Sequence, residues 1–319
     1  MTPKVSILIP CYNAEQWITA AIESALNQTY SNTEIIIIDD GSSDRSLEKI
    51  KQFGDLICWK TQSNQGGNIT RNNLLKLSNG DWIQYLDADD YLLSDKIEQQ
   101  INFLTQHPNT DVIFSPGIDE FWTNGQSHQQ IKPIPTITDP WILLAKWELP
   151  QTGRVLLKRD YLVTHGGWNE QQPCCQEHEL YFRLLTAGGV FRYCDHAGSV
   201  YRLWSQNTVS RHNPLNVYKE RLRIKERMYA FLQKSGQLTK PRLRAINQSR
   251  LDCARIIWNY NQHWATEIIA NIHAVEPKFS LAHSSLPPLY KVLYYVFGFS
   301  AAETVAAWKR NLSGVPGTL

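Results

Sequence analysis

The stretch WIQYLDADD, residues 82–90, joins a strand pattern to three carboxylates within four positions. Its first five residues are mostly large and apolar or aromatic, which predicts a buried β-strand. Carboxylates crowded at the end of such a strand repel one another and raise each other's pKa. A divalent cation relieves this repulsion, and Mg²⁺ is usually held by one or two carboxylates together with substrate phosphates. The stretch therefore indicates a metal site, with a solvated acidic loop as the structural alternative.

Strand and helix patterns alternate on both sides of this stretch. Further strands are predicted at 5–9, 34–38, 56–60 and 112–115, and helices near 17–26, 47–53, 70–77 and 95–107. The run 34–38 is apolar on both faces, which is typical of a parallel strand covered on both sides by helices. Asn13 is predicted to cap the first helix, with Gln16 in the capping-box position. Repeated units of this kind predict an α/β fold with a mostly parallel, doubly wound sheet.

Polar motifs follow three of the predicted strands. They are Pro10–Asn13, Asp39–Asp40 and Asp87–Asp89. In doubly wound sheets, ligands bind beyond the carboxyl ends of the strands, where the strand order reverses. We therefore expect these three motifs to line one crevice.

The order and spacing of five motifs resemble a family 2 glycosyltransferase with the GT-A fold, a Rossmann-like arrangement. The motifs are VSILIPCYN (5–13), QTY (28–30), IIIDDGSSD (36–44), NQG (64–66) with Arg71-Asn72, and DADD (87–90). The resemblance is strong over about residues 4–120 and weaker over 150–210. It implies sugar transfer from a nucleoside-diphosphate sugar, with UDP-sugar favoured, to an acceptor hydroxyl. It also implies dependence on Mg²⁺ or Mn²⁺.

The resemblance assigns a nucleotide pocket to residues of the first three motifs and to Arg71. Backbone around Pro10, Tyr12 and Asn13 would line it, together with Asp39 and Asp40. Tyr12 can stack on the nucleobase, and Asp40 can accept a hydrogen bond from a ring N–H such as that of uracil. Each assignment has a structural alternative: packing for the tyrosine, helix capping for either aspartate, and a surface ion pair for the arginine.

The DADD motif would hold the metal and the diphosphate. Alternate residues of an extended segment share a face, so Asp87 and Asp89 can reach the same diphosphate–metal unit. The resemblance implies Asp89 as the direct metal ligand. It places Asp87 at the ribose or the metal's water shell, and Ala88 in the same donor-binding stretch.

The segment QEHELYFRL, residues 176–184, resembles the family's helix that begins with a Glu-Asp pair and carries an Arg further on. Aligning Leu180 and Arg183 puts Glu177 at the position of the catalytic Asp, where it would be the general base. This is a departure, because Glu is one methylene longer. His178 is the competing base, and an ordinary acidic helix start is the structural alternative. Inversion at the anomeric carbon is implied by the resemblance.

A second departure lies in residues 201–210, which resemble the family's closing segment. There a His often follows a Tyr-Arg pair by two residues, but Trp204 occupies that place here. Arg202 or Arg211 is the alternative source of positive charge. We expect Trp204 to fill a core gap rather than to stack on an acceptor sugar.

Charge divides the chain into two parts. Residues 1–214 carry 17 Lys and Arg against 24 Asp and Glu, whereas residues 215–319 carry 15 against 6. This asymmetry predicts two structural units, the second basic. Together with the resemblance, it implies a catalytic domain (1–214), with nucleotide-sugar-binding (1–120) and acceptor-binding (121–214) parts, and a basic helical C-terminal appendage (215–319). The basic face is expected to be solvated, with peripheral contact to an anionic membrane near a lipid-linked acceptor as the alternative. Nucleic acid is not an expected partner, because no nucleic-acid-binding module accompanies the charge.

Other features of the sequence bear on the cellular compartment and on alternative functions. The six cysteines form no paired motif, no signal-peptide pattern is visible, and no apolar run reaches the ~18 residues of a membrane span. We therefore expect a cytoplasmic protein, with a peripheral place at the inner face of the membrane as the alternative. The acceptor is expected to be a glycan or a lipid-linked glycan. Competing interpretations are a nucleotidyltransferase, whose Gly-rich basic loop the segment 10–13 lacks, and a catalytically silent sugar-nucleotide-binding module.

Overall fold

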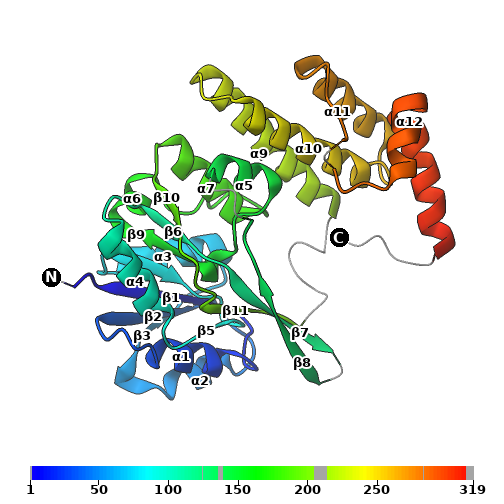
Figure 1. The fold of residues 1–319 in the computed structure, drawn as a ribbon. Helices are drawn as coiled ribbons and strands as arrows, with labels where there is room; N and C mark the ends of the chain where they lie inside the picture. The colour runs from blue at the N-terminus through cyan, green and yellow to red at the C-terminus, as the bar shows by residue number, and fades with distance from the viewer. Residues whose placement is uncertain (1, 124, 136–138, 205–213, 283, 314–319) are drawn as a thin grey trace. The chain divides into compact units, whose positions relative to one another are not determined.

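The computed structural model describes residues 2–123, 125–135, 139–204, 214–282 and 284–313 (Figure 1). The chain divides into two compact units, residues 1–208 and 209–319. This division lies close to the boundary predicted after residue 214. Each unit is described by itself.

The first unit is built on a seven-stranded sheet with the strand order β10-β6-β9-β4-β1-β2-β3 (Figure 1). Its strands are β1 (Val5–Cys11), β2 (Thr33–Asp39), β3 (Cys58–Thr61), β4 (Trp82–Tyr85), β6 (Val112–Phe114), β9 (Val155–Lys158) and β10 (Phe191–Tyr193). Strand β1 runs parallel to β2 and β4, and β9 alone among the seven is antiparallel to its neighbours. The predicted α/β fold with a mostly parallel sheet is confirmed.

Helices connect these strands. They are α1 (Ile18–Leu26), α2 (Ser46–Lys51), α3 (Gly67–Leu77), α4 (Lys96–Gln106), α5 (Pro140–Lys146), α6 (Arg159–Thr164) and α7 (Gln176–Thr186), with short 3₁₀ turns at Gly54–Leu56 and Thr152–Arg154. Ile7 and Ile37 of adjacent strands pack in one core with Ile18 and Ile22 of α1. Leu8, on the opposite face of β1, is also fully buried. Both faces of the central strands are therefore covered, as the doubly apolar run 34–38 predicted.

The strand order reverses beside β1. The chain moves outward from β1 to β2 and β3, and then returns to the other side of β1 as β4. In a parallel sheet this reversal leaves an opening beyond the carboxyl ends of β1 and β4. Pro10 is the next-to-last residue of β1, and Asp87 follows β4 by two residues.

A second sheet has the order β5-β11-β7-β8. It comprises β5 (Tyr91–Leu92), β7 (Gly117–Thr123), β8 (Gln126–Lys132) and β11 (Ser199–Leu203). The β7–β8 hairpin was not predicted, because every residue of β8 is exposed and the strand lacks the apolar alternation that marks a half-buried one. Strand β11 pairs with β5 directly after the DADD motif, so this sheet brings residues near 200 to the acidic turn.

The predicted helix cap at Asn13 is wrong. Helix α1 begins at Ile18, and its N-cap residue, Trp17, makes no side-chain capping bond. Asn13 instead has a left-handed backbone conformation (φ 49°), and its Oδ1 accepts a hydrogen bond from the Ser43 N–H at 2.8 Å. The asparagine therefore joins two loops of the crevice rather than starting a helix.

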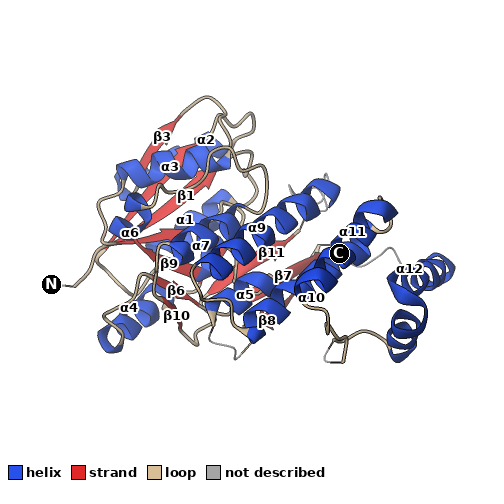
Figure 2. Ribbon diagram, turned by 90° about the horizontal axis from the view of Figure 1, so that it is seen from above, coloured by secondary structure: helices blue, strands red, loops and turns tan. Residues whose placement is uncertain are grey.

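The C-terminal unit is helical (Figure 2), as predicted. Its helices are α9 (Pro214–Lys234), α10 (Lys240–Ile257), α11 (Gln262–Val275) and α12 (Pro288–Ser313), the last kinked at Gly298. They share one apolar core, beside which buried Glu303 accepts hydrogen bonds from Arg255, Arg310 and Tyr290. Among the described residues, no helix combines the length and apolarity needed to cross a membrane.

Candidate active site

Two loops at the carboxyl ends of β1 and β2 are tied together by hydrogen bonds. The Asn13 N–H donates to Ser42 Oγ at 2.9 Å, and the Asp40 N–H donates to the Cys11 carbonyl at 2.8 Å. Tyr12 lies in the chain between the two residues that make these hydrogen bonds, and 53% of its surface is exposed. Its ring is therefore available to stack on a planar ligand above Pro10, which is half-buried.

Asp39 and Asp40 are both buried, but their carboxylates have different partners. Asp40 accepts hydrogen bonds from the Gln65 and Gly66 N–H groups and from Gln62 Nε2, at 2.7–3.0 Å. Asp39 Oδ2 accepts from the Thr61 hydroxyl at 3.2 Å, whereas its Oδ1 has no hydrogen-bond partner among the described residues. Asp40 thus holds the loop 62–66, and Asp39 keeps a buried oxygen that a donor group could satisfy.

Arg71 on α3 reaches the end of β4. Its Nη2 donates to Asp87 Oδ1 at 2.7 Å, and its guanidinium lies over the Trp168 ring, 4.9 Å from the ring centroid. Burial alone would lower the pKa of Arg71, but the Asp87 and Glu177 carboxylates outweigh it and hold this pKa above its usual value. The guanidinium therefore lies within electrostatic reach of residues from β4 and α7.

The acidic motif forms a turn rather than an extended segment. The Asp90 N–H donates to the Asp87 carbonyl at 3.0 Å, so the predicted alternation of faces does not hold over these residues. Ala88 in this turn is buried, and Asp89 is half-buried. Burial and the nearby Asp87 charge raise the pKa of Asp89. The two carboxylates are thus close enough to repel, although the turn and not a shared strand face brings them together.

Glu177 lies in the first turn of α7. Its Oε1 accepts a hydrogen bond from the Thr152 hydroxyl at 3.0 Å. His178 points elsewhere: its ring is buried and stacks flat on Trp147, with the ring centroids 3.7 Å apart. The geometry favours Glu177 over His178 as the group facing the crevice.

Tyr201 on β11 lies within electrostatic reach of the acidic residues of the site. Burial raises the pKa of Tyr201, and the charges of Asp90, Asp89, Asp87 and Glu177 raise it further. Four carboxylates from two separate chain segments therefore act electrostatically on one hydroxyl. The structure brings the predicted residues of β4 and α7 together at the reversal of the strand order.

The donor set at this point suits a diphosphate-bound divalent cation. The described residues contain no group of three or more His, Cys, Asp or Glu placed to hold a metal by themselves. Mg²⁺ and its relatives do not require one, because substrate phosphates supply further oxygens. Asp87 and Asp89 offer hard oxygen ligands, and the raised pKa of Asp89 shows that their charges are incompletely neutralised. These residues fit the predicted metal.

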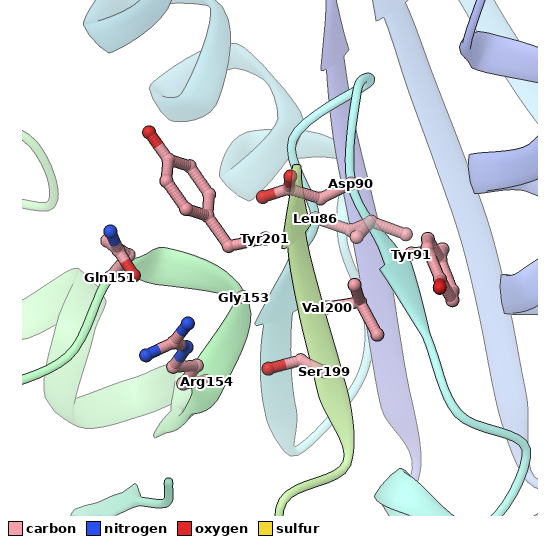
Figure 3. A pocket seen from close by; sticks show the side chains of 9 residues that line it. All are labelled: Leu86, Asp90, Tyr91, Gln151, Gly153, Arg154, Ser199, Val200 and Tyr201. Atoms are coloured by element: carbon pink, nitrogen blue, oxygen red, sulfur yellow. The ribbon is translucent and has the colours of Figure 1, made fainter. Parts of the chain in front are cut away.

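A small pocket lies behind the acidic turn (Figure 3). Figure 3 shows Asp90 and Tyr201 near one end of it, and Arg154 and Ser199 near the other. Its cavity volume of about 10 Å³ is far below the ~300–1,000 Å³ of typical ligand sites. The pocket therefore lies at the junction of the two sheets and is too small to be the substrate site.

Several residues of the site escaped sequence reasoning. Trp168 and Thr152 contact Arg71 and Glu177 across about 100 and 25 positions of the chain. Trp204 was expected to fill a core gap, but 43% of its surface is exposed, so this expectation is wrong. Arg202 pairs with Glu120 at 3.1 Å, and Arg211 lies outside the described residues. The sequence carried no signal for these contacts beyond the NQG–Arg71-Asn72 spacing.

Comparison with known proteins places this site in a family. Residues 6–162 match the family model described as Glycosyl transferase family 2. An uncharacterised glycosyltransferase of Rickettsia typhi is 33% identical over 199 residues, which are 61% of this chain and 62% of the relative. The UDP-Glc:alpha-D-GlcNAc-diphosphoundecaprenol beta-1,3-glucosyltransferase WfaP of Escherichia coli is 45% identical over 102 residues, 31% of this chain and 41% of WfaP.

The fold also has relatives among solved structures. Residues 1–349 of S. aureus TarS superpose with a TM-score of 0.62 at 16% identity, covering 99% of this chain and 93% of that one. TarS has also been crystallised with UDP-GlcNAc. This likeness confirms the GT-A-like fold. The chain spans less than two thirds of the length of the curated relatives it matches.

Replacing Asp40 with Asn should loosen the loop 62–66. An amide offers one acceptor oxygen where the carboxylate offers two, so at least one of the three bonded groups loses its partner. We expect Asp40→Asn to lower the free energy of unfolding by about 1–3 kcal/mol, measured by urea denaturation. Asp55→Asn, at an exposed site, is the matched control and should stay within about 0.5 kcal/mol of wild type. Equal stability of the two variants would contradict the holding role.

Proposed function

We propose that this chain, which belongs to glycosyl transferase family 2, transfers a sugar from a nucleoside-diphosphate sugar to an acceptor hydroxyl. The observation that carries the proposal is the convergence of Arg71, Asp87 and Glu177 beside the exposed Tyr12 at the reversal of the strand order. Such a crevice combines a surface for a base, charge for a diphosphate, and a carboxylate for an acceptor proton.

A UDP-sugar is the donor that we propose for the crevice. Tyr12 offers a ring face to the nucleobase, and Asp39 Oδ1 is an acceptor oxygen that no described residue satisfies. Asp40 holds the loop 62–66, which we place on the same side of the nucleotide site. The relative WfaP is named for a UDP-Glc donor, which supports the same choice.

The diphosphate would lie between Arg71 and the acidic turn. Asp89 would hold Mg²⁺ or Mn²⁺ directly, with Asp87 at the ribose or at the water shell of the cation. When bound, such a cation supplies charge neutralisation to the departing diphosphate. Arg71 orients Asp87 through their hydrogen bond and adds positive charge on the same side.

Glu177 would remove the proton of the acceptor hydroxyl as it attacks the anomeric carbon. The Thr152 hydroxyl orients this carboxylate by its bond to Oε1, which leaves Oε2 for the acceptor. Attack from the side opposite the diphosphate is a single in-line displacement, which inverts the configuration. The acceptor class we propose is a glycan or lipid-linked glycan, in line with the diphosphoundecaprenol acceptor that names WfaP.

Calorimetric titration tests the donor site. UDP and GDP are titrated into the full chain with and without Mn²⁺. We expect one of them, UDP by preference, to bind in a Mn²⁺-dependent way, and Asp89→Ala to abolish that dependence because the direct ligand is lost. Asp55→Ala, an exposed carboxylate, is the control and should bind as wild type does. Absence of binding by either nucleotide would remove the proposal.

A second experiment tests the base. Glu177→Gln keeps the shape of the side chain but cannot accept a proton. We expect it to lower the rate of UDP-sugar hydrolysis or transfer by about 10²–10⁴-fold, with UDP affinity unchanged. His178→Gln should retain more activity, because the imidazole stacks on Trp147. The reverse ranking would make His178 the base, and donor binding without turnover in wild type would indicate a silent binding module.

The C-terminal unit supports a proposed place of action at an anionic membrane surface. Helix α12 exposes Leu289, Val292, Tyr295, Val296 and Phe297, each between 49% and 67%. Residues 292–299 contain no charged side chain, and the part 215–319 has an excess of nine positive charges. An apolar face within a basic unit suits anionic lipid, which gives the cytoplasmic leaflet its negative potential. We therefore propose a cytoplasmic enzyme with peripheral contact at the inner face of the membrane.

Vesicle sedimentation tests this contact. We expect the full chain to bind phosphatidylglycerol vesicles more strongly than phosphatidylcholine vesicles, and the double variant Val296→Ser/Phe297→Ser to bind ~10-fold less, because each side chain loses apolar burial. Leu56→Ser/Ile131→Ser is the matched control, since both residues are similarly exposed in the first unit. Equal binding by the two double variants would contradict the role of α12.

A further inference from the structure

Strand β11 and Trp204, the residue that follows it, are bound to the acidic turn by three hydrogen bonds. The Arg202 N–H donates to Asp90 Oδ1 at 2.8 Å, and the Arg202 guanidinium donates to the Asp89 carbonyl at 3.2 Å. The third bond runs from the indole Nε1–H of Trp204 to Asp89 Oδ2, at 3.0 Å. One of these bonds goes to the backbone of the turn and two go to carboxylates. Of the two carboxylates, only that of Asp89 is a proposed metal ligand.

The indole that makes this bond is itself fixed. Its ring lies 5.6 Å from the ring of Trp17, which is buried and packs edge-on against Trp122. The Arg202 guanidinium covers Trp17 at 4.8 Å and is held by the Glu120 carboxylate. The position of the Trp204 N–H is therefore set by a packed aromatic and ionic group, although 43% of the residue is open to solvent.

The chemistry of this bond allows Trp204 to orient the Asp89 carboxylate but not to bind a cation itself. An indole N–H is a donor only, so Trp204 cannot bind a cation itself. Its bond goes to Asp89 Oδ2, so the indole itself does not block Oδ1 from binding a cation. A carboxylate fixed in this way by a neighbouring donor is the usual arrangement around metal ligands.

We propose that Trp204 is a positioning residue, which holds the Asp89 carboxylate so that Oδ1 faces the diphosphate-bound cation. This inference rests on the proposed function, because it assigns Trp204 a role at the same site. The bond is charge-assisted, since its acceptor is ionised when a cation is present. Trp204 thus contributes to metal affinity without touching metal or substrate.

The variant that isolates the hydrogen bond is Trp204→Phe. It keeps an aromatic ring against Trp17 and removes the N–H together with part of the indole ring; Trp204→Leu removes the aromatic ring as well. Mn²⁺ affinity is measured by electron paramagnetic resonance of free Mn²⁺ in the presence of UDP, and UDP affinity without metal by calorimetry. We expect the Mn²⁺ dissociation constant to rise about 10-fold and metal-free UDP binding to stay within twofold. Trp204→Leu, which also lacks the N–H, should show at least the same loss.

The control is Trp308→Phe, at a tryptophan that is 63% exposed in the other unit, and it should leave both affinities unchanged. Unchanged Mn²⁺ affinity in Trp204→Phe would overturn the inference, and tighter binding would show that the indole competes with the cation. In either case, loss of Mn²⁺ dependence in Asp89→Ala would leave the proposed function standing. If wild type itself shows no Mn²⁺-dependent UDP binding, the proposed function fails first and the inference falls with it.

Discussion

Repulsion among carboxylates gathered at one edge of a sheet is the constraint on which this site depends. Asp87, Asp89 and Asp90 lie within one turn, and Glu177 faces them from α7. Burial and the neighbouring Asp89 and Asp87 charges hold the pKa of Asp90 well above its usual range. Arg71 and Arg202 bind the two ends of the turn and offset part of this charge. The remaining negative charge is the physical basis of the proposed cation site.

The sequence predicted the parts of this arrangement that are local. Apolar runs specify β1, β2 and β4, and the rule for parallel strands then puts the motifs that follow them at one edge. The position of Glu177 depended instead on resemblance, because no local pattern links α7 to β4. Contacts such as Arg71 with Trp168, or Asp89 with Trp204, join segments about 100 residues apart. The pairing of β11 with β5 brings Trp204 to Asp89, and no apolar periodicity in the sequence predicts this pairing.

The two adjacent aspartates after β2 illustrate why residue type alone does not assign a role. Both have the same chemistry, and the resemblance selected Asp40 for the nucleobase. In the structure, both oxygens of Asp40 bind the loop 62–66, whereas Asp39 retains an unsatisfied oxygen although it is almost fully buried. An unpaired buried acceptor is destabilising, and this makes Asp39 the better candidate of the two for the proposed contact with the nucleotide. Loop geometry therefore divides two roles that sequence could not separate.

The longer side chain at position 177 is accommodated by its surroundings. A glutamate has one more rotatable bond than an aspartate, so an unrestrained one would sample more positions and act less well as a base. Here the Thr152 hydroxyl holds one oxygen, and the first turn of α7 favours the negative charge through the helix dipole. The raised pKa of Arg71 reflects attraction to Asp87 first and then to this same Glu177 carboxylate. The Thr152 bond thus fixes the position of Glu177, and the helix dipole and Arg71 stabilise its charge, which is what the proposed role of this glutamate requires.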